Sequence, residues 1–90
     1  MPRTERRFVI VNTLGLHARA AAQLVQLANR FHAEIHVEKD GMQVNGKSIM
    51  GVLTLAAAKG SSITVSADGE DAEHALAALA KVIENGFGEK

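Results

Sequence analysis

Two residues near the start of the chain have the types and the spacing that phosphoryl transfer needs. His17 stands directly before a stretch of helical pattern, and Arg19 follows two residues later. At the N-cap position the His17 imidazole faces the unpaired N–H groups of Ala18 and Arg19. These groups attract anions and disfavour an imidazolium, so we expect a neutral, nucleophilic ring near pH 7. The Arg19 guanidinium can turn back toward whatever the imidazole carries.

The turn before His17 has residues suited to hold this arrangement. Gly15 permits a tight turn, and Asn12 can cap the turn through its side-chain amide. The helix dipole would stabilise a bound phosphoryl group by only about 0.3–1 kcal/mol, or up to about 2 kcal/mol in a partly buried site. With one arginine rather than a cluster, such a site could hold the group and still release it. An ordinary capping histidine beside a solvated arginine is the alternative interpretation.

A second candidate is Ser48, which follows Gly46 and Lys47 at the start of a short apolar run. Its hydroxyl is typical of an N-cap, and a phosphate at that position would be stabilised by the helix. The run contains more apolar side chains than so short a helix can bury. We therefore expect an exposed patch that marks a binding surface, formed by Ile49, Met50 and Leu53. A plain N-cap with core residues behind it is the alternative.

Two further motifs point to nucleotide or metal binding, but only weakly. Gly41–Ser48 matches the P-loop pattern G-x-x-x-x-G-K-S, yet Met42–Asn45 alternates as a strand, and 90 residues leave no room for the rest of a nucleotide site. Glu70 and His74 lie four residues apart and could bind a metal ion, which makes a small metal-binding protein one alternative function. Because no third ligand is in view, we predict no metal site and no cofactor.

The elements that must position these residues follow from the spacing of apolar side chains. Alternating runs predict strands, and apolar residues three or four apart predict helices. Asp40-Gly41 is typical of a two-residue hairpin turn. In chain order we expect a strand at Arg6–Val11, a helix from Ala18 to Phe31 that His32 ends, and strands at Glu34–Glu38 and Met42–Asn45. A short helix at Ser48–Ala56 and a strand at Ser62–Ser66 follow. The last helix begins after Asp68-Gly69, has Glu70, Asp71 and Glu73 in its first turn, and ends at Asn85-Gly86.

This element order, βαββαβα, predicts an α+β fold. Two amphipathic helices and a short one need a sheet to cover. We therefore expect a four-stranded, mainly antiparallel sheet with three helices on one face, an open-faced sandwich. The chain has room for one domain, which spans residues 1–90.

Composition narrows the functions that this domain can have. Ten basic and ten acidic side chains give a net charge of zero, and only three residues are aromatic, so we expect no nucleic-acid partner. No stretch approaches a signal peptide or a membrane span, so we expect no membrane contact and a cytoplasmic location. Residues 1–30 nevertheless carry five arginines against one glutamate, a net +4. Around His17 the useful positive charge reduces to Arg19, the helix terminus and Lys47.

Two segments of the chain resemble a known protein family. Asn12–Ala22 (N-T-L-G-L-H-A-R-A-A-A) resembles the active-site segment of HPr, the histidine-containing phosphocarrier of the bacterial phosphotransferase system. Asn45–Leu55 (N-G-K-S-I-M-G-V-L-T-L) resembles the regulatory-serine segment of the same family. The resemblance implies a phosphoryl carrier rather than an enzyme. It also implies that His17 accepts the phosphoryl group at Nδ1, that Arg19 is the active-site arginine and that Ser48 is phosphorylated for regulation.

The same resemblance implies partners for the carrier. His17 would receive its phosphoryl group from phosphorylated Enzyme I and pass it to an enzyme IIA-type domain, and HPr kinase/phosphorylase would act on Ser48. The predicted partner-binding residues are Gln23 and Lys47 together with the apolar patch Ile49, Met50 and Leu53. We expect the carrier to be a monomer.

Two features of the active-site segment bear on the branch of the family. Ala20 stands where the family usually has proline, which makes the first helical turn less rigid while the chemistry should survive. The form G-L-H-A-R-A-A-A is similar to members of the nitrogen-related branch. The alternative function is therefore a regulatory, protein-binding module that acts through its phosphorylation state rather than in sugar uptake.

Overall fold

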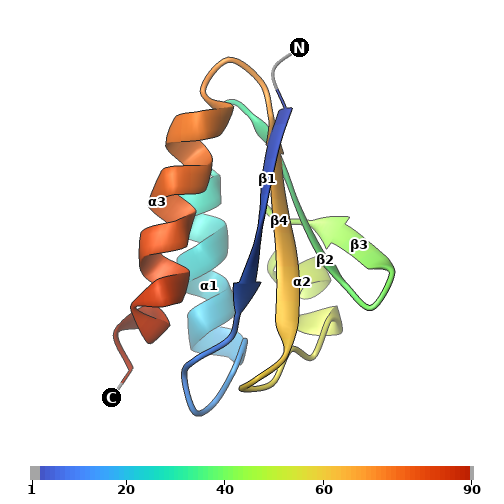
Figure 1. The fold of residues 1–90 in the computed structure, drawn as a ribbon, viewed down its shortest axis with the longest axis vertical. Helices are drawn as coiled ribbons and strands as arrows, with labels where there is room; N and C mark the ends of the chain where they lie inside the picture. Colours follow the sequence, from blue (N-terminus) through green and yellow to red (C-terminus); the bar gives the residue numbers. More distant parts are fainter. Residues whose placement is uncertain (1–2, 90) are drawn as a thin grey trace.

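The computed structural model describes residues 3–89, and its elements follow the order that the sequence predicts (Figure 1). The strands are β1 (Arg3–Val9), β2 (Glu34–Lys39), β3 (Met42–Asn45) and β4 (Ser62–Asp68); the helices are α1 (Ala18–Ala28), α2 (Ile49–Thr54) and α3 (Ala72–Glu84), followed by the 3₁₀ turn η1 (Gly86–Gly88). No helix in the described range 3–89 combines the length and the apolar character that a membrane span requires.

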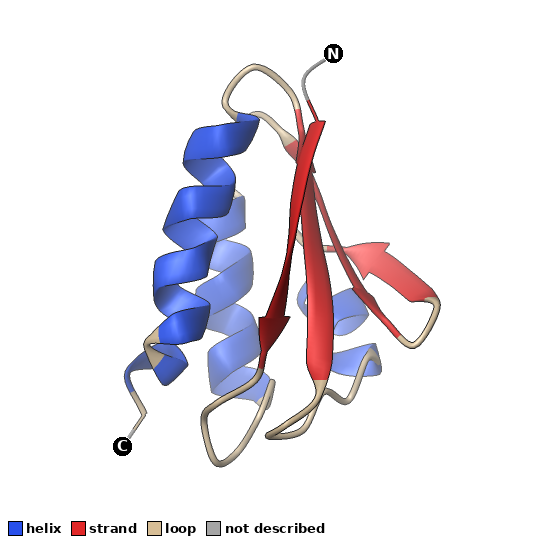
Figure 2. Ribbon diagram, viewed as in Figure 1, coloured by secondary structure: helices blue, strands red, loops and turns tan. Residues whose placement is uncertain are grey.

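The four strands form one sheet in the order β1-β4-β2-β3, and every neighbouring pair is antiparallel (Figure 2). Side chains alternate between the two faces, so Ile35, Val37, Ile63 and Val65 are all buried on the same face, against the helices. The predicted α+β fold, a mainly antiparallel sheet with helices, is confirmed.

Small side chains allow the helices to lie close to the sheet. Alanines supply much of the buried stripe of α1 and α3. The larger buried side chains of these stripes include Leu24 in α1 and Leu79 and Ile83 in α3. The stripe of α1 is fully buried at Ala20 and Ala21, within its first turns. The start of α1, directly after His17, is therefore held against the core.

The hairpin between β2 and β3 forms as predicted. Asp40 and Gly41 have φ values of 51° and 84°, both in the left-handed region that a type I′ turn requires. Met42–Asn45 then pairs with β2 as a regular strand. The segment that matches the P-loop pattern is thus a hairpin turn, a regular strand and a short turn before α2, not a single loop that surrounds a phosphate.

The boundaries of β1 and α1 differ from the predicted ones. β1 begins at Arg3 rather than Arg6, because pairing with β4, not apolar content, sets its extent. Beyond Ala28 the chain continues in tight turns, in which the N–H of Phe31 bonds to the carbonyl of Ala28 at 3.2 Å. His32 therefore lies past the helix and does not close it.

The start of α3 also differs from the prediction. The helix begins at Ala72, so Glu70 and Asp71 precede it and only Glu73 lies in its first turn. The Asp71 carboxylate instead accepts hydrogen bonds from the backbone N–H groups of His32 and Ala33, each at 2.8 Å. Asp71 is thus the N-cap of α3, and its carboxylate bonds to the loop before β2 instead of capping the helix.

Candidate functional site

Residues 12–17 connect β1 to α1 and form what we call the His17 loop. Gly15 has a φ of +63°, and the N–H of the next residue, Leu16, donates to the Ala57 carbonyl at 2.8 Å. A Cβ atom at Gly15 would collide with the Ala57 carbonyl oxygen and lie 2.9 Å from the Ala58 Cα. The loop therefore packs so tightly on the segment after α2 that only glycine fits.

Asn12 closes the His17 loop from inside. Its side chain is 4% exposed, and its Nδ2 donates to the Gly15 carbonyl at 2.8 Å. The same Nδ2 lies 3.3 Å from Oε2 of Glu89. Asn12 thus connects the loop both to itself and to the end of the chain.

His17 occupies the N-cap position of α1, with extended backbone (φ −74°, ψ 178°). Its carbonyl accepts the first helical bond from Ala21 at 2.8 Å, but its side chain makes no capping hydrogen bond. The predicted N-cap position of His17 is confirmed, and its imidazole does not use the N–H groups of Ala18 and Arg19 as hydrogen-bond donors. These N–H groups have no carbonyl partner within the helix, so they are available to an anion.

Arg19 and Gln23 share the surface around His17. Both line a small pocket next to the imidazole, together with Leu14 and Glu89. Arg19 is exposed, and its guanidinium is the nearest cation in the sequence to His17. The pocket combines a nitrogen base, a cation and the Glu89 carboxylate. The base, the cation and the N–H groups at the start of α1 are groups that can bind a phosphoryl group reversibly.

Glu89 is the residue of this site that the sequence analysis missed. Its Oε2 lies 3.1 Å from Nε2 of His17, and its Oε1 accepts the N–H of Leu14 at 2.9 Å. The Leu14 N–H is the main cause that lowers the pKa of Glu89 below its ordinary value, with further contributions from Asn12 and His17. The carboxylate is therefore ionised at neutral pH and acts only as an acceptor.

The chain end reaches His17 through a sharp reversal after α3. Gly86, Phe87 and Gly88 all have positive φ, at 62°, 58° and 73°. A left-handed conformation costs about 1–2 kcal/mol at a residue with a side chain, and burial of the Phe87 ring, which is 6% exposed, offsets this cost. We call residues 85–89 the C-terminal hook. The glycines around Phe87 were a visible signal for a reversal, but not for its target.

Ser48 caps α2 as the sequence predicts. Its Oγ accepts the N–H of Gly51 at 3.1 Å. Lys47, next to it, donates from Nζ to the carbonyl of Phe31 at 2.7 Å. Phe31 follows the C-terminal end of α1, whereas His17 precedes its first residue. An 11-residue helix is roughly 16 Å long, so the expectation that Lys47 adds positive charge around His17 is wrong.

The apolar patch on α2 is only partly buried. Met50 is 75% exposed and Ile49 is 40% exposed, while Leu53 is half-buried against the core. A six-residue helix cannot turn all of these side chains inward, because only one stripe of it faces α1 and β3. Helix α2, which carries the patch, packs on α1: Lys47 before α2 bonds to Phe31 after the end of α1, and Ala57 after α2 bonds to Leu16 before its start.

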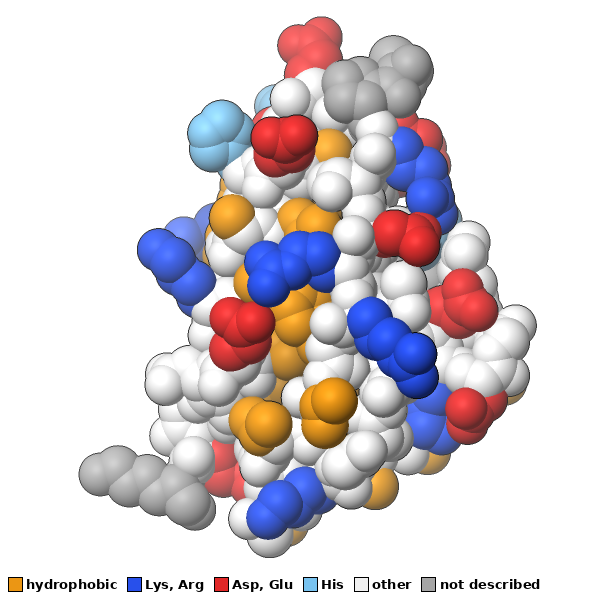
Figure 3. Space-filling model, viewed as in Figure 1, with side chains coloured by type: hydrophobic (Ala, Val, Ile, Leu, Met, Phe, Trp, Pro, Cys, Tyr) orange, Lys and Arg blue, Asp and Glu red, His pale blue; other side chains and the backbone are white. Residues whose placement is uncertain are grey.

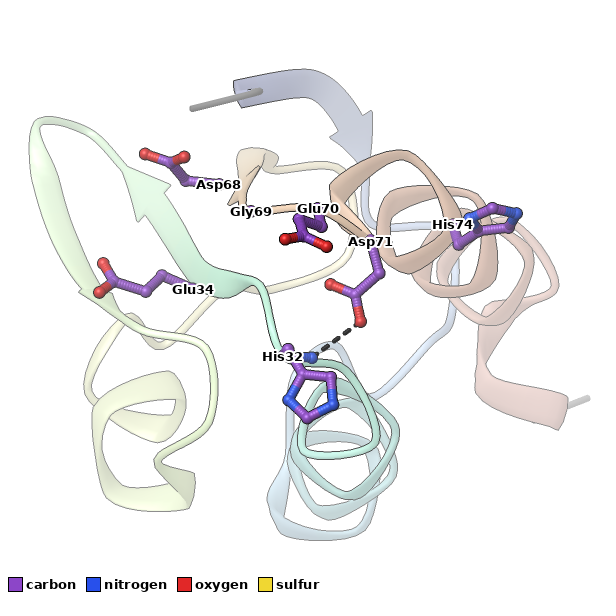
Figure 4. Close-up of a pocket in the computed structure, with 7 residues that line it drawn as sticks. All are labelled: His32, Glu34, Asp68, Gly69, Glu70, Asp71 and His74. Atoms are coloured by element: carbon purple, nitrogen blue, oxygen red, sulfur yellow. Dashed lines mark hydrogen bonds between the residues drawn. The ribbon is translucent and has the colours of Figure 1, made fainter.

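Two of the other histidines, His32 and His74, lie together away from His17, while His36 lies within β2. His32 and His74 line a pocket with four acidic side chains, in which the backbone N–H of His32 is bonded to Asp71 (Figure 4). The side chains of His32, Glu70 and His74 point in different directions in this view. Among residues 3–89 no group of three or more His, Cys, Asp or Glu side chains is arranged to hold a metal ion.

Comparisons with known proteins show which family this chain is similar to. The family model described as "PTS HPr component phosphorylation site" matches residues 4–85. The phosphocarrier protein HPr of Cupriavidus necator is 49% identical over 85 residues, which cover 94% of this chain and 96% of that protein.

Two solved structures from Thermoanaerobacter tengcongensis are also similar to this chain. One HPr structure superposes with a TM-score of 0.94 at 47% identity, covering 97% of this chain and 98% of the other. An HPr dimer has a TM-score of 0.78 at 49% identity, covering 91% and 94%. The chain therefore belongs to the HPr family of the phosphotransferase system, whose members are phosphocarrier proteins and not enzymes.

Proposed function

We propose that His17 is the residue of this phosphocarrier that accepts the phosphoryl group, and that Arg19 and the N–H groups at the start of α1 stabilise it there. The observation that supports this most directly is the side chain of His17 at the helix start. It makes no capping bond, so a phosphoryl group on the ring can reach the free N–H groups without displacing any protein contact. A neutral imidazole is the nucleophile, and the charge of the product is met by Arg19.

The partners we propose are Enzyme I as phosphoryl donor and an enzyme IIA-type domain as acceptor, in the cytoplasm. The apolar patch of Ile49, Met50 and Leu53 offers these proteins a docking surface, because apolar area exposed in the free carrier is buried on association. Gln23, beside His17, would contact the same partners. Lys47 would act at the far end of this surface rather than at the phosphoryl group.

Ser48 is the regulatory site in this proposal, with HPr kinase/phosphorylase as the enzyme that modifies it. A phosphate on Oγ adds about −1.5 to −2 charges beside Ile49 and Met50 at neutral pH. Its oxygens can still accept the N–H of Gly51, so the helix cap is retained. The modification would therefore weaken docking of Enzyme I without unfolding α2.

We propose that the carrier is monomeric. The edge strand β1 has charged, exposed side chains at Arg3, Glu5, Arg6 and Arg7, and Figure 3 shows basic and acidic side chains interspersed over the face that carries it. The other edge, β3, has only four residues. Charged and short edges oppose pairing with a second sheet. A mass measured by light scattering that equals two chains would contradict this proposal.

The test of the acceptor assignment is phosphoryl uptake. Incubation with phosphoenolpyruvate and Enzyme I should give a protein-bound phosphate that is labile in acid and stable in base, as a phosphohistidine is. The His17→Ala variant should take up none, whereas His32→Ala, altered at an exposed histidine away from His17, should be labelled like the wild type. Uptake by His17→Ala, or no uptake by the wild type with its cognate Enzyme I, would contradict the proposal.

A further inference from the structure

We propose that Glu89 is a positioning residue for phosphoryl transfer: its carboxylate holds the proton of His17 on Nε2 and so leaves Nδ1 as the nucleophile. The inference rests on the proposed function, because it takes His17 as the acceptor. It concerns a residue 72 positions away in the sequence, at the far end of the chain.

The contact between the two side chains fixes which nitrogen carries the proton. Nε2 of His17 lies 3.1 Å from Oε2 of Glu89, at hydrogen-bond distance. An ionised carboxylate has no proton to donate, so Nε2 must be the donor. In a neutral imidazole the other nitrogen then has the free lone pair. The side chains are 29% and 20% exposed, so water competes only weakly for this bond.

Glu89 is itself held in place, which a positioning role requires. Its second oxygen accepts the Leu14 N–H at 2.9 Å, and Asn12 Nδ2 lies 3.3 Å from the oxygen that faces His17. The buried ring of Phe87 and the two glycines around it bring the chain back to the His17 loop. The carboxylate thus has a fixed position relative to both the loop and the imidazole.

The charge of Glu89 also matches the change in charge during transfer. The Nδ1 lone pair attacks phosphorus, the bond from phosphorus to the donor atom breaks, and its electron pair leaves with the donor. The proton stays on Nε2, so the ring becomes a phosphorylated imidazolium with one positive charge. A carboxylate at Nε2 stabilises that charge, as in other sites where a carboxylate orients a histidine. On return transfer the charge disappears and the starting tautomer is restored.

The first experiment measures the tautomer without any phosphoryl donor. Long-range ¹H–¹⁵N NMR spectra of the uniformly labelled protein distinguish a proton on Nε2 from one on Nδ1. The wild type should show the Nε2–H form, and Glu89→Ala should show a mixture. Glu84→Ala is the matched control, since Glu84 is an acidic residue near the same chain end that contacts Arg6 at 3.3 Å and not His17. Its spectrum should equal that of the wild type.

The second experiment measures the rate of phosphoryl uptake in the same variants. Glu89→Ala should be slower by about tenfold, the loss expected for one charge-assisted hydrogen bond. Glu89→Gln keeps an oxygen acceptor but no charge, so it should lie between Ala and the wild type, and circular dichroism should show that all variants fold. A wild-type tautomer and rate in Glu89→Ala, or an equal loss in Glu84→Ala, would overturn the inference. Uptake by His17→Ala would overturn the acceptor assignment instead, whatever the tautomer.

Discussion

Each α-helix among residues 3–89 begins with a polar residue at the N-cap, and the N-caps of α1 and α2, His17 and Ser48, differ in what their side chains bond to. The hydroxyl oxygen of Ser48 accepts the N–H of Gly51 and so stabilises α2. His17 makes no such bond at α1 and instead turns its Nε2 to Glu89. At the start of α2 the N-cap side chain accepts a backbone N–H of the helix. At the start of α1 it does not, so the backbone N–H groups stay available.

The difference follows from what surrounds each N-cap. α2 has six residues and lacks a wide buried stripe, so the cap contributes much of what holds its first turn. α1 has eleven residues with Ala20 and Ala21 fully buried, so its start is stable without a capping side chain. A long, buried helix can thus leave its N-terminus free for an anion, and a short one cannot. The changes at Arg19 and Ser48 that follow test this contrast, and those at Gly15 and Asp71 test the loop before α1 and the N-cap of α3.

The largest expected effect is on the loop that presents His17. Gly15→Ala should lower the free energy of unfolding by about 2–4 kcal/mol, because a left-handed backbone and a collision with Ala57 act together. Urea denaturation measures the loss. Gly41→Ala is the control: it has a similar φ, of +84°, but nothing within 4 Å of the added Cβ, so it should lose only about 1–2 kcal/mol. Equal losses would show that the packing of the loop on Ala57 contributes nothing.

The second change removes the cation from the open helix start. Arg19→Ala should slow phosphoryl uptake by roughly 10–100-fold, because one charge-assisted contact to the phosphoryl group is lost. Stopped-flow or quench kinetics with Enzyme I measure this rate. Arg30→Ala, an exposed arginine after the other end of α1, should leave the rate within about twofold, as expected for a surface change away from the site. If both variants slow uptake equally, overall charge rather than the position of Arg19 matters.

The third change removes the side-chain cap of α2 at Ser48. Ser48→Ala should cost about 1 kcal/mol of stability through loss of the cap, which lowers Tm by roughly 4–8 °C in a domain of this size. Its phosphoryl uptake should not change. Ser48→Asp can still cap the helix, so it should retain the Tm, but its charge beside Ile49 and Met50 should slow uptake from Enzyme I. Unchanged kinetics in Ser48→Asp would count against regulation by a block of docking.

The smallest expected effect concerns the hydrogen bonds that the Asp71 carboxylate accepts from the backbone N–H groups of His32 and Ala33. The N–H of His32 is the main cause that lowers the pKa of Asp71 below its ordinary value. A carboxyl whose pKa is lower in the folded state stabilises the fold at pH values above its unfolded pKa, about 4, and loses this effect as pH falls through the folded value. Asp71→Asn should therefore melt below the wild type at pH 6, and this gap should shrink toward pH 3. A gap that does not change with pH would contradict the assignment.

Much of this protein is visible in its local sequence. The alternation of Ile35 and Val37, the Asp40-Gly41 pair and the serine before Ile49 each act over a few residues, so they predict strands, a hairpin and a helix cap directly. The position of His17 before α1 and the exposure of Met50 follow from the same short-range patterns. These features need only the backbone period and the chemistry of neighbouring side chains.

Only the tertiary structure decided which distant residues meet. Glu89 reaches His17 because three successive left-handed residues and a buried Phe87 reverse the chain, and no periodic pattern encodes the target of such a reversal. Lys47 lies at the wrong end of α1 for the predicted role because its ammonium group bonds to Phe31. The sequence by itself thus determined the position of His17, the proposed acceptor, directly before the helix α1. The contact between Glu89 and His17, which leaves Nδ1 of the imidazole free, depends on how the segment after α3 packs against the His17 loop.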